Sequence, residues 1–285
     1  MTSKIIDGRL IAKKIKKELH DEVCKLKRKY KIKPTIATVI IGNDPSSELY
    51  LKLRENACKE VGINTIYTRL KDNVTEKETV DSIRLLNNDE SIHGILVQYP
   101  VPSHISQNNL ISAINPSKDV EGFNPVNIGK TLLGDEYIIP CTPLSVLKII
   151  EHENENIKGK DIVIINHSNV VGKPLAALLL NRNATVSICH IFTKNLKFYS
   201  SNADILISAV GKPKFITKEY VKENAFIIDV GIAKTEGGIS GDINFESVKE
   251  KVGKITPVPG GVGPVTITSS IQNTITLYKN SIERL

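Results

Sequence analysis

The stretch "KDIVIINHSNVVGKPLAALLLNRNATVSICHI", residues 160–191, decides the fold of this chain. Its apolar run at 161–165 predicts a buried strand, and a polar turn at 166–171 then leads into a helical pattern that begins near Gly172. A second strand follows and ends at "SICHI". Two strands joined by a helix are parallel neighbours in a sheet, so this stretch predicts a dinucleotide-binding α/β fold.

The turn itself is a weak signal for a nucleotide, because it lacks the regular GxGxxG pattern. Asn166 can take positive φ more readily than most residues, and Ser168 can donate a hydrogen bond to a phosphate. Gly172 allows close packing of the helix, and Pro174 suits a first helical turn. The alternative is an ordinary turn between a strand and a helix.

The second strand indicates which dinucleotide fits. An NAD-specific site places Asp or Glu about 20 residues beyond the turn, where it holds the ribose 2′-hydroxyl. Here the strand ends "SICHIFTK" with no carboxylate, and His167, His190 and Lys194 are near it in sequence. A 2′-phosphate is therefore tolerated, which favours NADP over NAD.

The rest of the chain continues this rhythm of strands and helices. Buried strands are predicted for "TIATVIIG" (35–42), "HGILVQYP" (93–100), "ADILISAVG" (203–211) and "AFIIDVGI" (225–232). Residues 115–143 are rich in turn formers and predict a connector that carries functional loops. We expect an α/β protein of two lobes: a first domain of residues 1–121 with a C-terminal helix at 266–285, and a Rossmann-like domain of residues 122–265.

Composition argues against several classes of function. The net charge of +7 comes from dispersed lysines without interleaved aromatic residues, so nucleic-acid binding is disfavoured. A small anionic ligand accounts for the positive charge as well as a nucleic acid does. The first residues lack the apolar block of a signal peptide, and no run of eighteen apolar residues follows. We therefore expect a cytoplasmic protein with no membrane partner.

Metal binding and cysteine catalysis are also disfavoured. The four cysteines are scattered without metal-type pairing, and the histidines have no HExxH spacing. Asp119 and Glu121 are two residues apart in a turn-rich loop, which does not establish the opposed carboxyls of a glycosidase. Cys141 and Cys189 have no catalytic partner pattern and are better explained as core thiols.

A phenol and a guanidinium share one predicted helix face in "ELYLKLRENACKEVGI", residues 48–63. Four residues bring Arg54 back to within about 40° of Tyr50, whereas two residues turn Lys52 away by roughly 200°. Tyr50 and Arg54 are therefore candidates for one site, and the helix geometry argues against Lys52.

Over essentially its full length the chain resembles the bifunctional methylenetetrahydrofolate dehydrogenase/cyclohydrolase family. The matching stretches, in their common order, are "DPSSELYLKLRENACKEVGI", "HGILVQYPVPSHI", "PSKDVEGFNPVNIGK", "PCTP", "SNVVGKPLAALLLNRNATVSICH", "ADILISAVG", "DVGI", "GDINFESV" and "TPVPGGVGPVT".

The resemblance implies an oxidoreductase and hydrolase of one-carbon metabolism that supports purine biosynthesis. It implies a folate cleft between two lobes, a homodimer, and two linked reactions: oxidation of 5,10-methylenetetrahydrofolate by NAD(P)+, then hydrolysis of the methenyl product to 10-formyltetrahydrofolate. The implied catalytic residues are Tyr50, Arg54, Gln98 and Glu121. The implied substrate-binding residues are Tyr50, Val97, Gln98, Glu121, Gly263, Pro264 and Ile267, and the implied cofactor-binding residues are Thr142, Asn166, His167, Ser168, Ile191, Gly231 and Ile232.

Two departures from the family pattern concern the hydrolytic step. The family usually has lysine at the position of Arg54 and aspartate at the position of Glu121. An arginine keeps the charge but does not shuttle protons, so we expect dehydrogenase activity with weakened cyclohydrolase activity. The longer acid and the differently shaped cation are interpreted as a coupled change. In the alternative interpretation, Arg54 is a surface cation outside the site.

Two further departures concern the cofactor. The family turn commonly reads Gly-Arg-Ser where this chain has Asn166-His167-Ser168, and a serine is common at the position of Ile191. NADP stays the first expectation and NAD the alternative. A fully bifunctional enzyme and a non-catalytic folate- or nucleotide-binding protein remain alternative functions. The sequence leaves open whether Lys52 assists hydrolysis.

Overall fold

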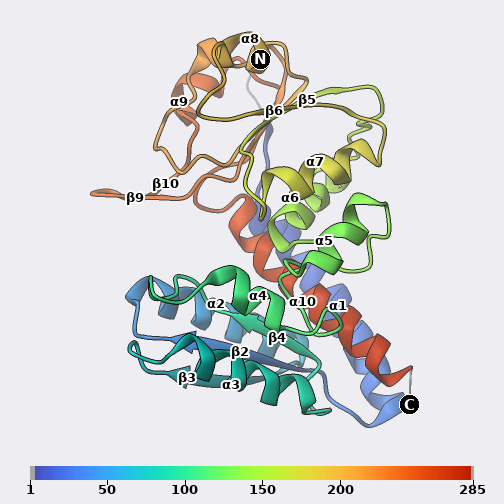
Figure 1. Ribbon diagram of the computed structural model, residues 1–285. Coiled ribbons are helices and arrows are strands. Elements are labelled where there is room, and N and C mark those ends of the chain that lie inside the picture. The colour runs from blue at the N-terminus through green and yellow to red at the C-terminus, as the bar shows by residue number, and fades with distance from the viewer. Residues whose placement is uncertain (1–3, 284–285) are drawn as a thin grey trace. The chain divides into compact units, whose positions relative to one another are not determined.

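The computed structural model describes residues 4–283, with the backbone alone for residues 45–47 (Figure 1). The chain forms two compact units, which are described separately below. Unit 1 comprises Met1–Lys13, Thr131–Asp135 and Thr142–Thr266, and unit 2 comprises Lys14–Lys130, Glu136–Cys141 and Ile267–Leu285.

Unit 1 is built on a six-stranded sheet in which every neighbouring pair of strands is parallel. The strands are, in spatial order, β1 (Lys4–Ile5), β11 (Lys254–Ile255), β8 (Phe226–Asp229), β7 (Ile205–Ser208), β5 (Asp161–Ile165) and β6 (Thr185–Cys189). β5, β7 and β8 are almost fully buried, as apolar strands covered on both faces should be. The strands expected from 161–165, 203–211 and 225–232 are thus confirmed.

The helices of unit 1 follow the βαβ pattern expected from the sequence. They are α6 (Cys141–His152), α7 (Gly172–Leu180), α8 (Leu196–Ser200), the 3₁₀ turn η1 (Lys218–Tyr220) and α9 (Phe245–Val248). An antiparallel hairpin of β9 (Ala233–Thr235) and β10 (Gly238–Ser240) projects from this unit (Figure 1). The helix α7 joins β5 to β6, so the stretch at 160–191 folds as predicted.

Unit 2 contains a three-stranded parallel sheet in the order β3 (Asn64–Leu70), β2 (Thr35–Ile41) and β4 (Gly94–Val97). All seven residues of β2 are buried, because both faces of the sheet are covered. Ala37, Val39 and Ile41 pack with residues of α3 (Glu76–Asn88) and α4 (Gln107–Ala113). Ile36 faces the other way and packs with residues of α1 (Gly8–Tyr30), α2 (Pro45–Val61) and α10 (Val262–Ile282).

The last helix begins earlier than predicted. Instead of a helix from residue 266, α10 begins at Val262, so Gly263 and Pro264 lie in its first turn. Proline is tolerated there because the first N–H groups of a helix have no partner within the helix. The helix therefore starts inside the glycine- and proline-rich stretch "TPVPGGVGPVT".

The connector at 115–143 also contains more regular structure than expected. A short helix, α5 (Pro125–Leu132), forms within it, and the amide N–H of Val126 donates to Oδ1 of Asn124 at 3.0 Å.

The predicted domain limits, 1–121 with 266–285 and 122–265, stay a prediction, because a compact unit is not the same as an independently folding piece. Among the described residues, no helix is long and apolar enough to cross a membrane.

Candidate functional site

Tyr50, Arg54 and Gln98 form one cluster in unit 2. Tyr50 and Arg54 lie one turn apart on α2, and Gln98 follows the last residue of β4. Cζ of Arg54 lies 4.9 Å from the centroid of the Tyr50 ring, and its Nη1 donates to Oε1 of Gln98 at 3.3 Å. Gln98 is held in turn, because its Nε2 donates to the carbonyl of Tyr99 at 2.9 Å.

The guanidinium of Arg54 is buried, with only 5% of the residue exposed. Its Nε has no hydrogen-bond partner among the described residues, which is unusual for a buried donor. Lys52 is exposed on another face of α2, as the helix geometry predicted. The alternative interpretation of Arg54 as a surface cation is therefore wrong.

Glu121 lies in a loop that the carboxylate of Asp119 organises. Oδ1 of Asp119 accepts the N–H of Gly122 at 3.0 Å, and Oδ2 accepts the N–H of Asn124 at 2.8 Å. Gly122 has φ of +71°, and a Cβ there would meet the nitrogen of Pro140 at 2.7 Å. A tight turn that only glycine fits thus fixes the backbone on one side of Glu121.

Burial and neighbouring charges shift the pKa values of this cluster. Burial raises the pKa of the Glu121 carboxyl, Arg54 opposes the rise, and the charge of Asp119 adds to it. Burial also raises the pKa of Tyr50 to about 12, again against the effect of Arg54. Tyr50 is therefore a neutral phenol at physiological pH and can act as a hydrogen-bond donor.

Arg54 and Glu121 interact through their charges but form no ion pair in the part of the chain that the structure describes. The guanidinium donates to Gln98 instead. The hypothesis of a coupled change between the two residues therefore depends on electrostatics and not on a direct contact.

Each of the other predicted substrate residues lies in a hydrophobic core cluster or in the first turn of α10. The side chain of Val97 is 3% exposed and packs in the core beside β2. Ile267 is 9% exposed and belongs to the opposite core cluster with Leu96 and Val120. Gly263 and Pro264 lie among the residues of unit 1. The substrate-binding roles of all four stay predictions.

The phosphate turn of unit 1 is organised by the side chain of Asn166. Its Oδ1 accepts the N–H groups of Ser168 at 2.8 Å and Gly172 at 3.0 Å, and its Nδ2 donates to the carbonyl of Ala209 at 2.7 Å. The expectation of positive φ at Asn166 is wrong, because the left-handed non-glycine residues of the described chain lie elsewhere. The side chain, rather than an unusual backbone angle, shapes the turn.

Gly172 is required at the start of α7, as predicted. A Cβ at Gly172 would lie 2.1 Å from the carbonyl oxygen of Asn166. Oγ of Ser168 donates to Asn166 at 2.7 Å and accepts the N–H of Val171 at 3.1 Å, so this hydroxyl already has two partners. A phosphate contact would require Ser168 to exchange one of them.

Three backbone N–H groups of the turn remain available to a ligand. Those of His167, Asn169 and Val170 form no hydrogen bond with the described residues, and an anion is the ligand that such a group of donors favours. The rings of His167 and His190 lie 4.9 Å apart between centroids. Ile191 follows and is 83% exposed. The donors and the imidazoles suit a dinucleotide phosphate.

The remaining predicted cofactor residues lie at the end of a strand or at the start of a helix in unit 1. Gly231 and Ile232 follow β8, and Ile232 is exposed. A Cβ at Gly231 would lie 2.1 Å from the carboxylate of Asp242, so only glycine fits at this position. The carbonyl of Thr142, in the first turn of α6, accepts the hydroxyl of Ser145 at 2.7 Å.

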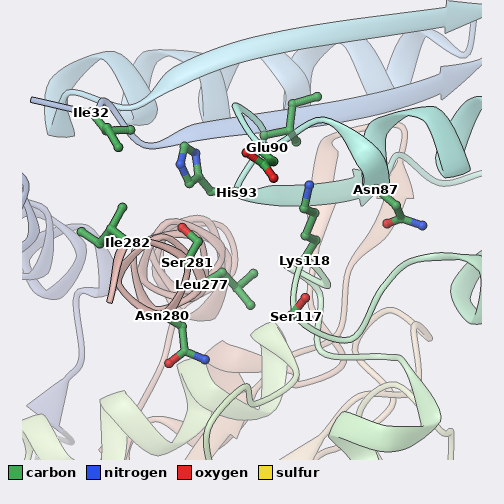
Figure 2. Close-up of a pocket in the computed structure, with 11 residues that line it drawn as sticks. Ile32, Asn87, Glu90, His93, Ser117, Lys118, Leu277, Asn280, Ser281 and Ile282 are labelled. Carbon is green, nitrogen blue, oxygen red and sulfur yellow. The ribbon is translucent and has the colours of Figure 1, made fainter. Parts of the chain in front are cut away.

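Unit 2 also contains a cavity of about 330 Å³ (Figure 2), and Tyr50, Arg54 and Gln98 are not among the residues that line it. His93 lines it at the start of β4, whereas Gln98 follows the end of that strand, about 16 Å along the chain. Burial lowers the pKa of His93 to about 4 and also lowers the pKa of Lys118 on the cavity wall.

The described residues hold no cluster of three or more His, Cys, Asp or Glu side chains that could bind a metal.

Sequence reasoning missed several buried polar residues that hold these sites in place. Nδ2 of Asn273 donates to the carbonyls of Val120 at 2.9 Å and Ile139 at 2.8 Å, beside Glu121. Asp242 accepts hydrogen bonds next to the predicted cofactor residues. Both are polar residues in otherwise apolar or turn-rich stretches, which is the only signal that the sequence offers.

Comparisons with known proteins fit this geometry. The family model described as "Tetrahydrofolate dehydrogenase/cyclohydrolase, catalytic domain" matches residues 6–121, and the model described as its NAD(P)-binding domain matches residues 140–282. The chain is 46% identical over 280 residues to "Bifunctional protein FolD" of Methanosarcina mazei, with 98% of each chain covered.

Two solved structures are similar over almost the whole chain. The bifunctional enzyme FolD of Campylobacter jejuni has a TM-score of 0.96 and 44% identity, covering 99% of this chain and 100% of its own. The FolD of Trypanosoma brucei, solved with NADP cofactor and an inhibitor, has a TM-score of 0.94 and 35% identity, with 99% of each chain covered. This chain belongs to the tetrahydrofolate dehydrogenase/cyclohydrolase family.

Proposed function

We propose that the protein oxidises 5,10-methylenetetrahydrofolate to 5,10-methenyltetrahydrofolate with NADP+, and that it hydrolyses the methenyl product to 10-formyltetrahydrofolate only weakly. The catalytic and NAD(P)-binding domains of the family support the oxidation. The buried guanidinium of Arg54, in contact with Tyr50 and Gln98, carries the proposal of weak hydrolysis. It is a fixed cation at the position where the family usually has lysine.

The oxidation depends mainly on binding and orientation. NADP+, when bound, accepts the hydride from the folate methylene carbon. We assign Tyr50, Gln98 and Glu121 to the folate, because a pterin ring offers amide and amine edges that an amide and a carboxyl can bind. Arg54 places a positive charge beside them. None of these roles requires a proton to leave Arg54.

The hydrolysis needs a proton acceptor. Water that adds to the methenyl carbon gives up a proton, and a group in the site must take it. Arg54 does not do this, since a guanidinium stays protonated in proteins. Lys52 is exposed on another face of α2, so it does not replace the missing lysine from its present position.

Glu121 supports the competing proposal of a fully bifunctional enzyme. Its carboxyl has a raised pKa and interacts with Arg54, which makes it a chemically reasonable proton acceptor for the attacking water. The longer side chain of glutamate extends its reach by about one bond length, and displacement by about 1 Å can change rates on the order of a hundredfold. The relative rate of hydrolysis distinguishes the two proposals.

We propose NADP as the preferred dinucleotide, with NAD as the alternative. The free N–H groups of the turn at His167, Asn169 and Val170 fit a phosphate of either. The paired imidazoles of His167 and His190, with no carboxylate after β6, favour the additional phosphate of NADP. Thr142, Asn166, Ser168, Ile191, Gly231 and Ile232 complete the proposed cofactor site.

We also propose that the protein is a homodimer. In unit 1, β6 is an edge strand, and several apolar side chains on it and near it are exposed: Ile188, Phe192, Phe198 and Tyr199. Edge strands and exposed apolar patches favour association. Light scattering should give twice the mass of the chain, and a monomer at micromolar concentration contradicts the proposal.

A spectrophotometric assay tests the proposed reactions. The purified protein is mixed with methylenetetrahydrofolate and either dinucleotide to follow oxidation, and with methenyltetrahydrofolate to follow hydrolysis. We expect faster oxidation with NADP+ and slow hydrolysis. Hydrolysis as fast as that of the Arg54→Lys variant supports the bifunctional alternative. Folate binding without either reaction supports a non-catalytic binding protein.

A further inference from the structure

Two buried aspartates of unit 1 lie side by side in the structure although they come from separate motifs. Asp229 ends β8 in "DVGI" and is 3% exposed, and Asp242 lies in "GDINFESV" and is fully buried. The backbone N–H of Asp242 donates to Oδ1 of Asp229 at 3.0 Å. Neither residue has a role in the reactions proposed above.

The Asp242 carboxylate holds the segment that follows β7. Its Oδ2 accepts the hydroxyl of Ser208 at 2.8 Å and the N–H of Val210 at 2.6 Å, and its Oδ1 accepts the N–H of Lys212 at 2.9 Å. Three donors within five residues of chain therefore converge on one side chain. An amide in place of the carboxylate has only one acceptor atom, so it cannot keep all three bonds.

The Asp229 carboxylate ties the segment after β8 to Asp242. Its Oδ1 also accepts the N–H of Gly231 at 3.0 Å, and its Oδ2 accepts the N–H of Ile243 at 2.9 Å. A Cβ at Gly231 would lie 2.1 Å from Oδ1 of Asp242. The segment after β8 therefore packs directly against the Asp242 carboxylate, where only a bare backbone fits.

The same segment after β7 reaches the phosphate turn. The carbonyl of Ala209 accepts Nδ2 of Asn166 at 2.7 Å, and Asn166 organises the turn with its other amide atom. The strands β8, β7 and β5 are consecutive neighbours in the sheet. The backbone segments at their carboxyl ends, where dinucleotides bind in folds of this kind, are thus joined through Asp242.

We propose that Asp242 is a positioning residue for the dinucleotide. It acts through the backbone after β7 and β8, and it does not touch the ligand. Its three hydrogen bonds set the spacing between Gly231 and the turn at Asn166, and loss of that spacing displaces the contacts for the cofactor. The inference rests on the dinucleotide binding assigned to unit 1 under the proposed function, and it does not depend on the hydrolytic step.

The test compares Asp242→Asn with Asp204→Asn in the full chain. Asp204 is a matched control: it precedes β7 at the opposite end of the strand and accepts the N–H of Asp161 at 3.0 Å and Nζ of Lys222 at 2.7 Å. NADPH affinity is measured by fluorescence titration, and unfolding by thermal denaturation. The KM values for NADP+ and for folate are measured separately.

We expect Asp242→Asn to weaken NADPH binding by about tenfold or more and to raise the KM for NADP+ but not for folate, because a displacement of about 1 Å has effects of this size. Asp204→Asn should change NADPH affinity by less than about twofold even where it lowers the melting temperature. A folded Asp242→Asn variant with unchanged affinity overturns the inference, as does an equal loss in Asp204→Asn.

A milder variant covers the case in which Asp242→Asn does not fold. Ser208→Ala removes one of the three donors to Asp242 and should weaken NADPH binding a few-fold, whereas unchanged binding overturns the inference. Wild-type protein that binds neither NADPH nor NADH refutes the proposed function together with the inference. Wild-type binding with unaltered binding by the variants refutes the inference alone.

Discussion

The guanidinium of Arg54 lies over the ring of Tyr50, with 4.9 Å between Cζ and the ring centroid. Such a contact is favourable because the face of an aromatic ring attracts a cation. It also limits where the guanidinium can go, since the same group donates to Gln98. The contact makes Arg54 a fixed charge in the proposed site rather than a mobile one, and the first two predictions follow from it.

Arg54→Lys should raise the rate of methenyltetrahydrofolate hydrolysis relative to that of oxidation. A lysine amine can exchange a proton with the reacting water, which is worth about a hundredfold or more where the geometry is right. We expect a gain of at least about tenfold, measured as the ratio of the two kcat/KM values. The control is Lys52→Arg, the reverse exchange at an exposed position of α2. No gain in Arg54→Lys refutes the role assigned to Arg54.

Arg54 and Glu121 should prove to be coupled in a double-mutant cycle. The variants are Arg54→Lys, Glu121→Asp and the double variant, with hydrolysis as the readout. Because Arg54 acts on the charge of Glu121, we expect an interaction free energy of about 0.5–3 kcal/mol. Strictly additive effects contradict the interpretation of the two residues as a coupled change.

His190→Ala should reduce kcat/KM for NADP+ more than for NAD+. The imidazole lies beside that of His167, and a cationic or hydrogen-bonding group near a 2′-phosphate distinguishes the two dinucleotides. We expect the ratio of the two kcat/KM values to fall about tenfold or more, because a hydrogen bond to a charged group contributes about 1.5–3 kcal/mol. Thr185→Ala, at an exposed position at the start of β6, is the control. A wild-type preference for NAD+ contradicts the assignment of NADP.

The free energy of unfolding should decrease as pH rises from about 4 to 6 through Asp229. Burial raises the pKa of this carboxyl to about 6, and the charge of Asp242 adds to the effect. A raised pKa in the folded state stabilises the protein below the ordinary pKa of 3.8, and this stabilisation is lost as pH rises through 6. The expected loss is about 3 kcal/mol.

Urea denaturation of the wild type and of Asp229→Asn across this pH range measures that contribution. The difference in unfolding free energy between the two proteins should change with pH. A difference that stays constant from pH 4 to 6 shows that Asp229 does not titrate there.

Asn273→Leu should destabilise the protein by about 2–4 kcal/mol. Without Nδ2 of Asn273, the buried carbonyl of Ile139 would lose its donor, and that of Val120 would keep only the thiol of Cys141 at 3.3 Å. Asn280→Leu is the control, two turns further along α10 at a partly exposed position. Equal unfolding free energies for wild type and Asn273→Leu contradict the importance of these hydrogen bonds.

Local pattern was sufficient for much of the architecture. Apolar runs at 161–165 and 35–42 became buried parallel strands, and the helical period placed Tyr50 and Arg54 on one face and Lys52 on another. These features depend on a few neighbouring residues, because side-chain direction repeats every two residues in a strand and every 3.6 in a helix. The start of α10 was predicted wrongly, because glycine and proline in a first helical turn resemble a loop.

The sequence by itself determined the βαβ order of the chain and the helix face shared by Tyr50 and Arg54, since both follow from periodicity over short distances. Only the tertiary structure decided that Arg54 is buried against Gln98, 44 residues away, and that Asp242 joins segments from different strands. Hydrogen bonds and desolvation act between atoms that folding brings together, and no local pattern records those pairs.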